Sequence, residues 1–389
     1  MKKILILDPS CVSDSRSHHM NAILGHARAF LAAGFKVSLG TNIKCSIKSN
    51  DFDNYPVFTY TIYDDYKNKV GKYSLFKTIP HCYLQIKTKK IVANLLNTDG
   101  IREHQEIFVP STDWILFQSL MKIYSKAENK PNIHFLIMYE QGSWMTGGYP
   151  YNKIIGALKK NANDLQKNIF IYTETNKHAQ NISRELGFIP PNYSYPSFPV
   201  SDVSIDSGRH IYIGALGGGR KDKGYDMLPD IISKFNDLFD DNENVRFLIQ
   251  RARDEDNLGK ATQILERIKN VILLDNQLTQ HQYYNNLLRC SIAIFPYNSN
   301  VYDTRGSGII NEAIANGIPI ICNSETALSE AIICDNGISV ANVEHYSEAI
   351  VNVINNLSTY SNNALAAKEE YLEHIYNNPV IKNINTDNR

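Results

Sequence analysis

Short aliphatic runs alternate with helical patterns along the first part of the chain. Residues 4–7 are four aliphatic side chains followed by Asp8, which is typical of a buried parallel strand. Residues 20–31 carry apolar side chains at i, i+3, i+4 and i+7 spacing, which predicts a helix with one face on a sheet, and Gly34 ends it. Residues 36–40 predict the next strand. A strand, a helix and a strand within about 40 residues indicate a βαβ unit.

The same alternation starts again near residue 209. Strands are predicted at 57–60, 106–109, 133–138, 169–172, 211–214, 246–250, 271–274, 291–295 and 319–322, and a helix at 225–239. Four prolines lie within residues 189–199, and they favour a semi-rigid linker. We therefore expect two doubly wound α/β domains with parallel sheets, at 1–195 and 205–360, with a C-terminal helix at about 362–389 as a candidate to pack back on the first. Such sheets bind ligands at the carboxyl ends of their strands, so a site is expected in the cleft between the domains.

Composition excludes several classes of protein. The 389 residues include 40 Lys+Arg and 40 Asp+Glu, so the basic surplus of a nucleic-acid binder is missing. With 43% hydrophobic and 21% charged residues, the chain has the composition of a folded globular protein. No apolar run reaches the ~18 residues of a membrane span. The six cysteines are scattered without zinc-ligand spacing, which favours a reduced, cytoplasmic protein without a metal.

One stretch after the strand predicted at 291–295 is suited to binding a phosphate. Ser307 and Gly308 can begin a helix, with Ser307 as its N-cap, and Gly317 can end it. A helix start presents free N–H groups and a partial positive charge, which attract a phosphate. Glu312 lies one turn inside, where a carboxylate can accept hydrogen bonds from ribose hydroxyls. On these residues alone, an ordinary capped helix with Glu312 in solvent is an equal alternative.

A glycine-rich loop follows the strand predicted at 211–214. Gly217 and Gly218 allow a backbone to approach a ligand closely. Three cations in the loop supply positive charge for a diphosphate: Arg220, Lys221 and Lys223. Taken alone, a solvated turn is the alternative interpretation of these cations.

Together these residues resemble the donor site of the GT-B fold glycosyltransferases, particularly the retaining family 4. That family has the pattern E-x7-E, then A, a small residue, G, x, P, and V or I. Its second half is matched by Glu312, Ala313, Ala315, Gly317, Pro319 and Ile320. The family's first glutamate would fall on Thr304. Its G-R-x4-K-G loop resembles residues 214–224, although Ala215 replaces the arginine and the loop is longer. The resemblance covers about 170–355, and residues 1–165 fit by architecture only.

The resemblance implies that the second domain binds a nucleotide sugar of the UDP or GDP type. Glu312 would contact the ribose. The diphosphate would be bound by the backbone amides of Ser307 and Gly308, together with the side chains of Lys223 and Arg220. The other donor-binding candidates are Gly217, Gly218, Arg251, Arg253, Tyr302, Thr304 and Arg305. Catalysis would rest on charge stabilisation of the leaving diphosphate, with no cofactor or metal. Retention is the family's outcome, and with Thr304 at the sugar-contact position both stereochemical outcomes stay open.

The first domain is expected to bind the acceptor, a glycan or a lipid-linked glycan. His18 and His19 precede the first helix, where many GT-B enzymes face the acceptor, and a histidine there can act as a base or bind a sugar phosphate. Glu140 follows the strand at 133–138 and is a candidate to bind either sugar. A capping histidine and a loop carboxylate are the structural alternatives. By analogy, the product is expected to be a bacterial surface glycan.

Residues 67–96 contain seven lysines and no acidic residue, with aromatic and aliphatic residues between them. This pattern predicts that the Lys67-to-Lys90 stretch docks on an anionic membrane surface or an anionic acceptor, which would make the protein peripheral at the inner face of the cytoplasmic membrane. A solvated helix face is an equal alternative.

Two other functions stay open from the sequence. A nucleotide-sugar epimerase of the same fold would need several carboxylates and histidines around the donor sugar. A non-catalytic sugar- or nucleotide-binding subunit is favoured by Thr304.

Asp51 and Asp53 have the DxD spacing of metal-dependent glycosyltransferases, but we expect them in a polar loop. The glycines at 214–219 depart from the dinucleotide motif G-x-G-x-x-G.

Overall fold

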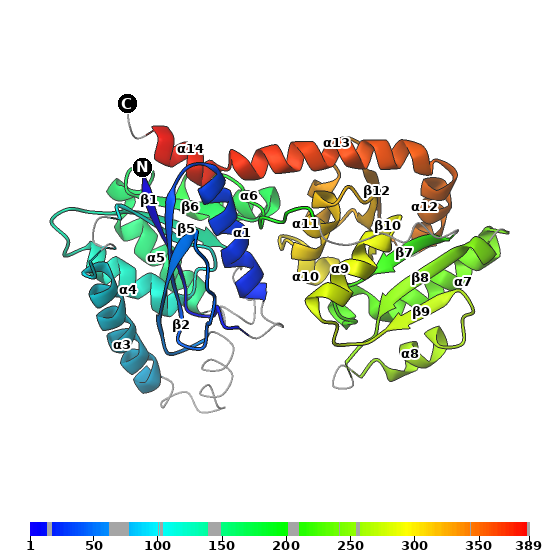
Figure 1. Cartoon of the computed structure of the whole chain (residues 1–389), viewed down its shortest axis with the longest axis horizontal. Helices are drawn as coiled ribbons and strands as arrows, with labels where there is room; N and C mark the ends of the chain where they lie inside the picture. Colours follow the sequence, from blue (N-terminus) through cyan, green and yellow to red (C-terminus); the bar gives the residue numbers. More distant parts are fainter. Residues whose placement is uncertain are drawn as a thin grey trace. The chain divides into compact units, whose positions relative to one another are not determined.

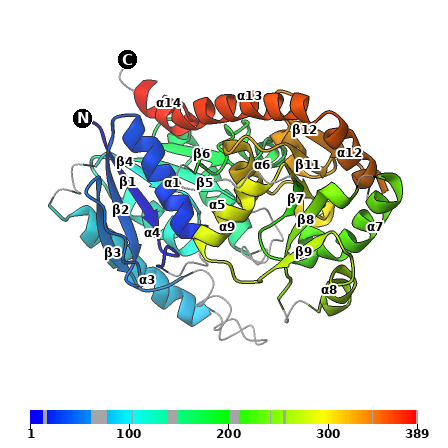
Figure 2. The ribbon, with the colours of Figure 1, turned by 45° about the vertical axis from the view of Figure 1, so that its right-hand side comes forward.

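The chain forms two compact units, each built on a six-stranded parallel sheet (Figure 1). The computed structural model describes residues 1–13, 18–61, 78–99, 101, 104–138, 149–200, 210–240, 242–253, 257–342 and 344–386. Unit 1 is Met1–Pro196 with Ile375–Arg389, and unit 2 is Ser197–His374. Helices flank the sheet in each unit (Figure 2). The predicted fold class, two doubly wound α/β units, is confirmed.

The sheet of unit 1 has the order β3-β2-β1-β4-β5-β6. Its strands are β1 (Lys3–Asp8), β2 (Lys36–Asn42), β3 (Phe52–Phe58), β4 (Glu106–Val109), β5 (Asn132–Ile137) and β6 (Ile169–Thr173). The strand predicted at 57–60 was placed too late, because β3 pairs with β2 from Phe52 onward. Asp53 therefore lies on this strand and not in a polar loop, and its carboxylate is 4.0 Å from Lys36 Nζ.

Alternate residues of this sheet face two different helical layers. The helices are α1 (His18–Ala32), α3 (Thr78–Leu96), α4 (Trp114–Tyr124), α5 (Tyr149–Lys160), α6 (Asn176–Leu186) and α14 (Pro379–Thr386). Leu5 and Leu7 join one buried cluster with residues of α3, α4 and α5. Phe108 faces the other side, where its ring centroid is 5.5 Å from that of Phe30 on α1. The period of two in the strands thus gives each face its own core.

Unit 2 repeats the design with the order β12-β11-β10-β7-β8-β9. Its strands are β7 (Ile211–Ala215), β8 (Val245–Gln250), β9 (Val271–Leu274), β10 (Ile292–Phe295), β11 (Ile320–Asn323) and β12 (Gly337–Val340). Its helices are α7 (Leu228–Leu238), α8 (Gly259–Leu265), α9 (Gln280–Arg289), α10 (Ser299–Tyr302), α11 (Gly308–Ala315) and α12 (Glu344–Asn355). The helix predicted at 225–239 is a 3-10 turn, Tyr225–Met227, followed by α7, because Pro229 favours the first turn of a new helix.

The C-terminal segment forms two helices where one was predicted at 362–389. The long helix α13 (Leu357–Tyr376) carries the chain out of unit 2, and α14 belongs to unit 1. Val380, Ile381 and Ile384 of α14 are buried, and Lys2 Nζ donates a hydrogen bond to the Ile384 carbonyl oxygen at 2.6 Å. Within the residues described, no helix combines the length and the apolar character that crossing a membrane takes.

Candidate functional site

The glycine-rich loop after β7 lies against the start of α11. Gly217 and Gly218 have φ values of +97° and +76°, which are left-handed conformations that side chains with a Cβ rarely adopt. A Cβ atom on Gly217 would lie 1.7 Å from Cδ1 of Ile309, the second residue of α11. Glycine at this position thus allows the loop to approach the helix start.

Gln250, the last residue of β8, holds this loop in place. Its side-chain oxygen accepts hydrogen bonds from the Gly217 and Gly218 amides at 2.8 and 2.6 Å. Its side-chain nitrogen donates to the Asn276 carbonyl oxygen at 3.3 Å. Gln250 was not predicted as a site residue from the sequence. The signal was present, because a polar side chain that ends a buried strand lies at the edge where parallel sheets bind ligands.

Three cations gather beside the loop. Arg220 makes two hydrogen bonds to the Asp222 carboxylate, at 2.9 and 2.8 Å, and a third to the Tyr302 hydroxyl at 3.0 Å. The Arg305 guanidinium carbon lies 5.4 Å from the centre of the Tyr302 ring. Lys223 Nζ donates to the Gly217 carbonyl oxygen at 2.6 Å.

The charge of Lys223 is poorly compensated. Burial, together with the nearby positive charges of Arg220 and Arg305, lowers the pKa of its ammonium group to about 7, against the attraction of Asp222 and Glu312. An anion placed here would favour the protonated form of Lys223 and would gain a charge-assisted hydrogen bond. The cluster is therefore suited to binding a phosphate group.

Glu312 completes the site from α11. The Tyr283 hydroxyl on α9 donates a hydrogen bond of 2.5 Å to Glu312 Oε2. Burial raises the pKa of the Glu312 carboxyl group to about 7, although Tyr283 and the Lys223 charge favour its ionised form. The alternative that placed Glu312 in solvent is wrong, because the side chain is partly buried and bonded. Tyr283 itself was not predicted.

The other donor-side candidates differ in burial and in what their side chains contact. Gly308 begins α11, and Ser307 occupies its N-cap position but makes no capping hydrogen bond with its side chain. Thr304, three residues before Ser307, is buried. The Arg251 guanidinium, however, pairs with the Glu266 carboxylate at 2.6 Å. Arg253 is exposed to solvent.

In unit 1, the carboxyl end of β1 holds a buried histidine. His19 Nδ1 lies 2.8 Å from Asp8 Oδ2, and both side chains are almost fully buried. Asp8 Oδ1 accepts a hydrogen bond from the Ser10 amide at 2.9 Å. Asp8 was missed as a partner, although an acid directly after an aliphatic run marks the ligand-binding edge of a parallel sheet. The His18 side chain and Glu140 lie outside the described residues.

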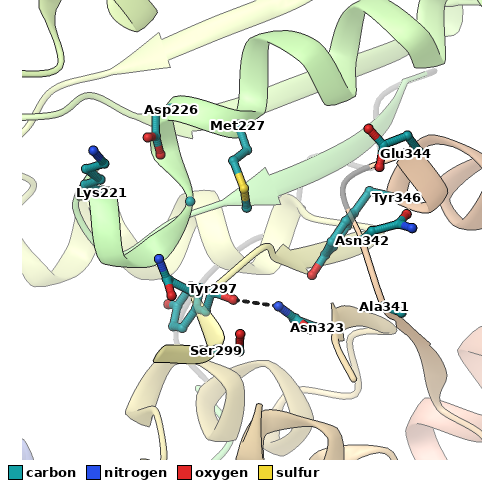
Figure 3. Close-up of a pocket in the computed structure, with 12 residues that line it drawn as sticks. Lys221, Asp226, Met227, Tyr297, Ser299, Asn323, Ala341, Asn342, Glu344 and Tyr346 are labelled. Carbon is teal, nitrogen blue, oxygen red and sulfur yellow. Dashed lines mark hydrogen bonds between the residues drawn. The ribbon is translucent and has the colours of Figure 1, made fainter. Parts of the chain in front are cut away.

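A cavity of 340 Å³ lies beside the loop, at the carboxyl ends of β10, β11 and β12 (Figure 3). Asn323 donates to the Tyr297 carbonyl oxygen at 3.0 Å, which Figure 3 marks with a dashed line. The Tyr346 hydroxyl donates to the Phe295 carbonyl oxygen at 3.0 Å. Two of the lining polar groups thus pair with the protein, and we assign no ligand to this cavity.

The chain resembles known proteins in fold but not in sequence. No family model matches it, and no curated protein matches it in sequence. Among solved structures, the trehalose-6-phosphate synthase OtsA matches with a TM-score of 0.69 at 8% identity, over 100% of this chain and 98% of the other. Anabaena HepE, solved in complex with UDP-glucose, matches with a TM-score of 0.63 at 11% identity, over 99% and 100% of the two chains. A glycosyltransferase from Rickettsia africae matches with a TM-score of 0.62 at 12% identity, over 98% and 96%.

The fold is GT-B. The expectation of this fold is thereby confirmed, whereas the assignment to family 4 within it stays a prediction. In the GT-B sheet of unit 2, the glycine-rich loop and Gln250 lie at the carboxyl ends of β7 and β8. This is the edge at which open α/β sheets bind their ligands.

The two loop glycines offer a matched test of the contact with α11. Gly217→Ala should destabilise the protein by about 2 kcal/mol or more, because it adds a collision with Ile309 to the cost of a left-handed alanine. Gly218→Ala should cost only about 1 kcal/mol, because its Cβ would meet nothing within 4 Å. Thermal denaturation of both variants measures the difference. Equal losses of stability would show that the loop does not depend on close approach to the helix.

Proposed function

We propose that the protein is a glycosyltransferase that moves a sugar from a nucleotide-sugar donor to a sugar acceptor. The observation that carries this proposal is the convergence of Lys223, Arg305 and Glu312 on one loop and one helix start in a GT-B fold. Cations and helix amides suit a diphosphate, and a partly buried carboxylate suits a ribose diol. A donor of the UDP type is supported by the UDP-glucose complex of HepE.

The donor site would work mainly through charge. When the bond between the sugar and the β-phosphate breaks, the electron pair stays on the phosphate oxygen. Lys223 and Arg305, with the free N–H groups of the first turn of α11, would stabilise that oxygen. Arg220 acts less directly, because Asp222 already neutralises it. With these cations supplying the charge, we propose transfer without added metal and, from the family 4 resemblance, with retention of configuration.

The acceptor is assigned to unit 1. Asp8 holds Nδ1 of His19, which fixes the tautomer and leaves Nε2 as the basic nitrogen, the arrangement of a general base. The family 4 resemblance supports a glycan or lipid-linked glycan acceptor and a role in the synthesis of a bacterial surface glycan. The described cysteines are free thiols, which supports a cytoplasmic location.

Asp8→Asn tests the role of the histidine. The asparagine amide would donate to His19 Nδ1 and force the ring proton onto Nε2, so transfer to the acceptor should fall about 100-fold or more. Affinity for the nucleotide should not change, because Asp8 belongs to unit 1. Initial rates of transfer and calorimetric titration of the nucleotide separate the two effects. A variant that folds and transfers at the normal rate would remove His19 from the mechanism.

The function itself is tested by incubating the protein with a panel of UDP-, GDP-, ADP- and CMP-sugars. Slow release of free sugar and nucleotide, without acceptor, identifies a transferase that accepts that donor. Formation of an epimer identifies the competing epimerase. Saturable binding without turnover, even when candidate acceptors are added, identifies a non-catalytic subunit, which the buried Thr304 in place of a glutamate favours. Glu312→Gln, assayed in parallel, shows whether a signal arises from the candidate site.

A further inference from the structure

The outer side of α3 in unit 1 presents two large apolar side chains to solvent. Tyr83 is 66% exposed and Ile86 is 59% exposed, and they lie one helical turn apart. The inner side of the same helix is buried, with Val92 and Leu95 in the core of unit 1. Both views place α3 at the periphery of unit 1 (Figures 1 and 2). The helix therefore has a buried face and, opposite it, an apolar pair that no described residue covers.

Positive charge is concentrated beside this pair. Lys90 is exposed and lies seven positions after Tyr83, on the same side of the helix as Tyr83 and Ile86. Lys87 and Lys89 lie beside Lys90 on the same helical turn. Immediately before α3, the sequence has four more lysines, at 67, 69, 72 and 77, whose placement lies outside the described residues. No acidic residue occurs in this stretch before Asp99, in a chain whose net charge is zero. This local surplus points to an anionic partner.

We propose that the α3 surface, defined as Tyr83, Ile86, Lys87, Lys89 and Lys90, docks the protein on an anionic lipid bilayer. Tyrosine and isoleucine enter the boundary between headgroups and acyl chains, and the lysines contact the lipid phosphates. The inference does not depend on the proposed donor site, because unit 1 alone carries the surface.

The same features argue against the other occupants of such a surface. A twofold contact with a second copy would bring two sets of lysines together, and like charges repel. A nucleic acid would contact only the lysines, through its phosphates. It would leave Tyr83 and Ile86 exposed to water, whereas a bilayer would surround them with apolar groups. A bilayer with anionic headgroups satisfies both the charge and the apolar pair.

The test is sedimentation of the full chain with phosphatidylcholine vesicles, with and without about one third phosphatidylglycerol. We expect binding to the anionic vesicles only, with release as salt rises from about 0.05 to 0.5 M. Tyr83→Ser with Ile86→Ser, and separately Lys87→Gln, Lys89→Gln and Lys90→Gln together, should each lower the partition coefficient at least about tenfold.

Matched controls keep the result specific to the α3 surface. Leu238→Ser removes an apolar side chain that is 55% exposed in unit 2. The triple variant Lys122→Gln, Lys126→Gln and Lys160→Gln removes three exposed lysines elsewhere in unit 1. Both controls should bind vesicles like the wild type. The proposal is overturned if the wild type ignores lipid charge, if the α3 variants bind like the controls, or if light scattering finds a dimer that Tyr83→Ser and Ile86→Ser abolish.

Discussion

Replacing Glu312 with glutamine is expected to weaken binding of the donor nucleotide about tenfold or more. A ribose diol bonded to an ionised carboxylate is a charge-assisted pair, and its loss costs roughly 1.5–3 kcal/mol. Because burial raises the pKa of Glu312 to about 7, the carboxylate forms as pH rises through 7, and the difference between the two proteins should be larger at pH 8 than at pH 6. Calorimetric titration of the preferred nucleotide sugar into both proteins, at pH 6 and at pH 8, measures this difference in affinity.

The control for this variant is Glu243→Gln, which makes the same change at an exposed carboxylate of unit 2, at the amino end of β8. It should change affinity much less than Glu312→Gln. Thermal stability of the ligand-free Glu312→Gln protein should stay close to that of the wild type, since glutamine can still accept the Tyr283 hydrogen bond. Equal nucleotide affinities for wild type and Glu312→Gln at pH 8 would remove this carboxylate from the donor site.

Replacing Lys223 with methionine is expected to lower nucleotide-sugar affinity by about 10- to 100-fold, the range for a hydrogen bond between an ammonium group and a phosphate. The wild type should also bind more weakly as pH rises from about 7 to 9, because a lysine whose pKa is about 7 loses its charge over that range. Lys223→Arg keeps its charge at all these pH values, so its affinity should fall far less between pH 7 and 9. Titrations at several pH values, with a nucleotide sugar whose phosphates do not titrate near neutrality, measure all three proteins.

The stability of the same variants shows whether the effect is local. An unfolded lysine binds its proton up to a pKa near 10.4, whereas folded Lys223 loses it near 7. Burying the charge therefore costs most stability at pH 7 and below, and the cost shrinks as pH rises towards about 10.4. Ligand-free Lys223→Met should therefore melt at the same temperature as the wild type or higher. If Lys223→Met binds the nucleotide sugar as tightly as the wild type, or if wild-type affinity does not change above pH 7, the cluster does not bind the diphosphate.

Strands were predictable where the chain carries a short, continuous apolar run. The bounds of β4 and β9 match the predicted ones, although β4 is buried inside its sheet and β9 is a partly buried edge strand. β3 was misplaced because Phe52–Phe58 mixes polar residues with a proline and has no such run. Its position depends on pairing with β2, which local sequence does not encode.

The site was predictable only where residues follow one another in a motif. Glu312 and Lys223 were found by their order along the chain, together with the glycines of the loop. The residues that hold them were not, since Tyr283 lies 29 positions from Glu312 and Gln250 lies 33 positions from Gly217. Those contacts arise from the packing of α9 beside α11 and of β8 beside β7, and no local pattern specifies them.

Unit 1 is discontinuous in the chain, and this sets the order in which the protein can be completed during synthesis. Residues 1–196 leave the ribosome before unit 2, but α14, which buries Val380, Ile381 and Ile384 in that unit, leaves after unit 2. Unit 2 is one continuous segment and has all its strands before α14 is made. The half that is begun first is therefore completed only after unit 2, and it exposes the apolar surface beneath α14 to chaperones until α14 has been made.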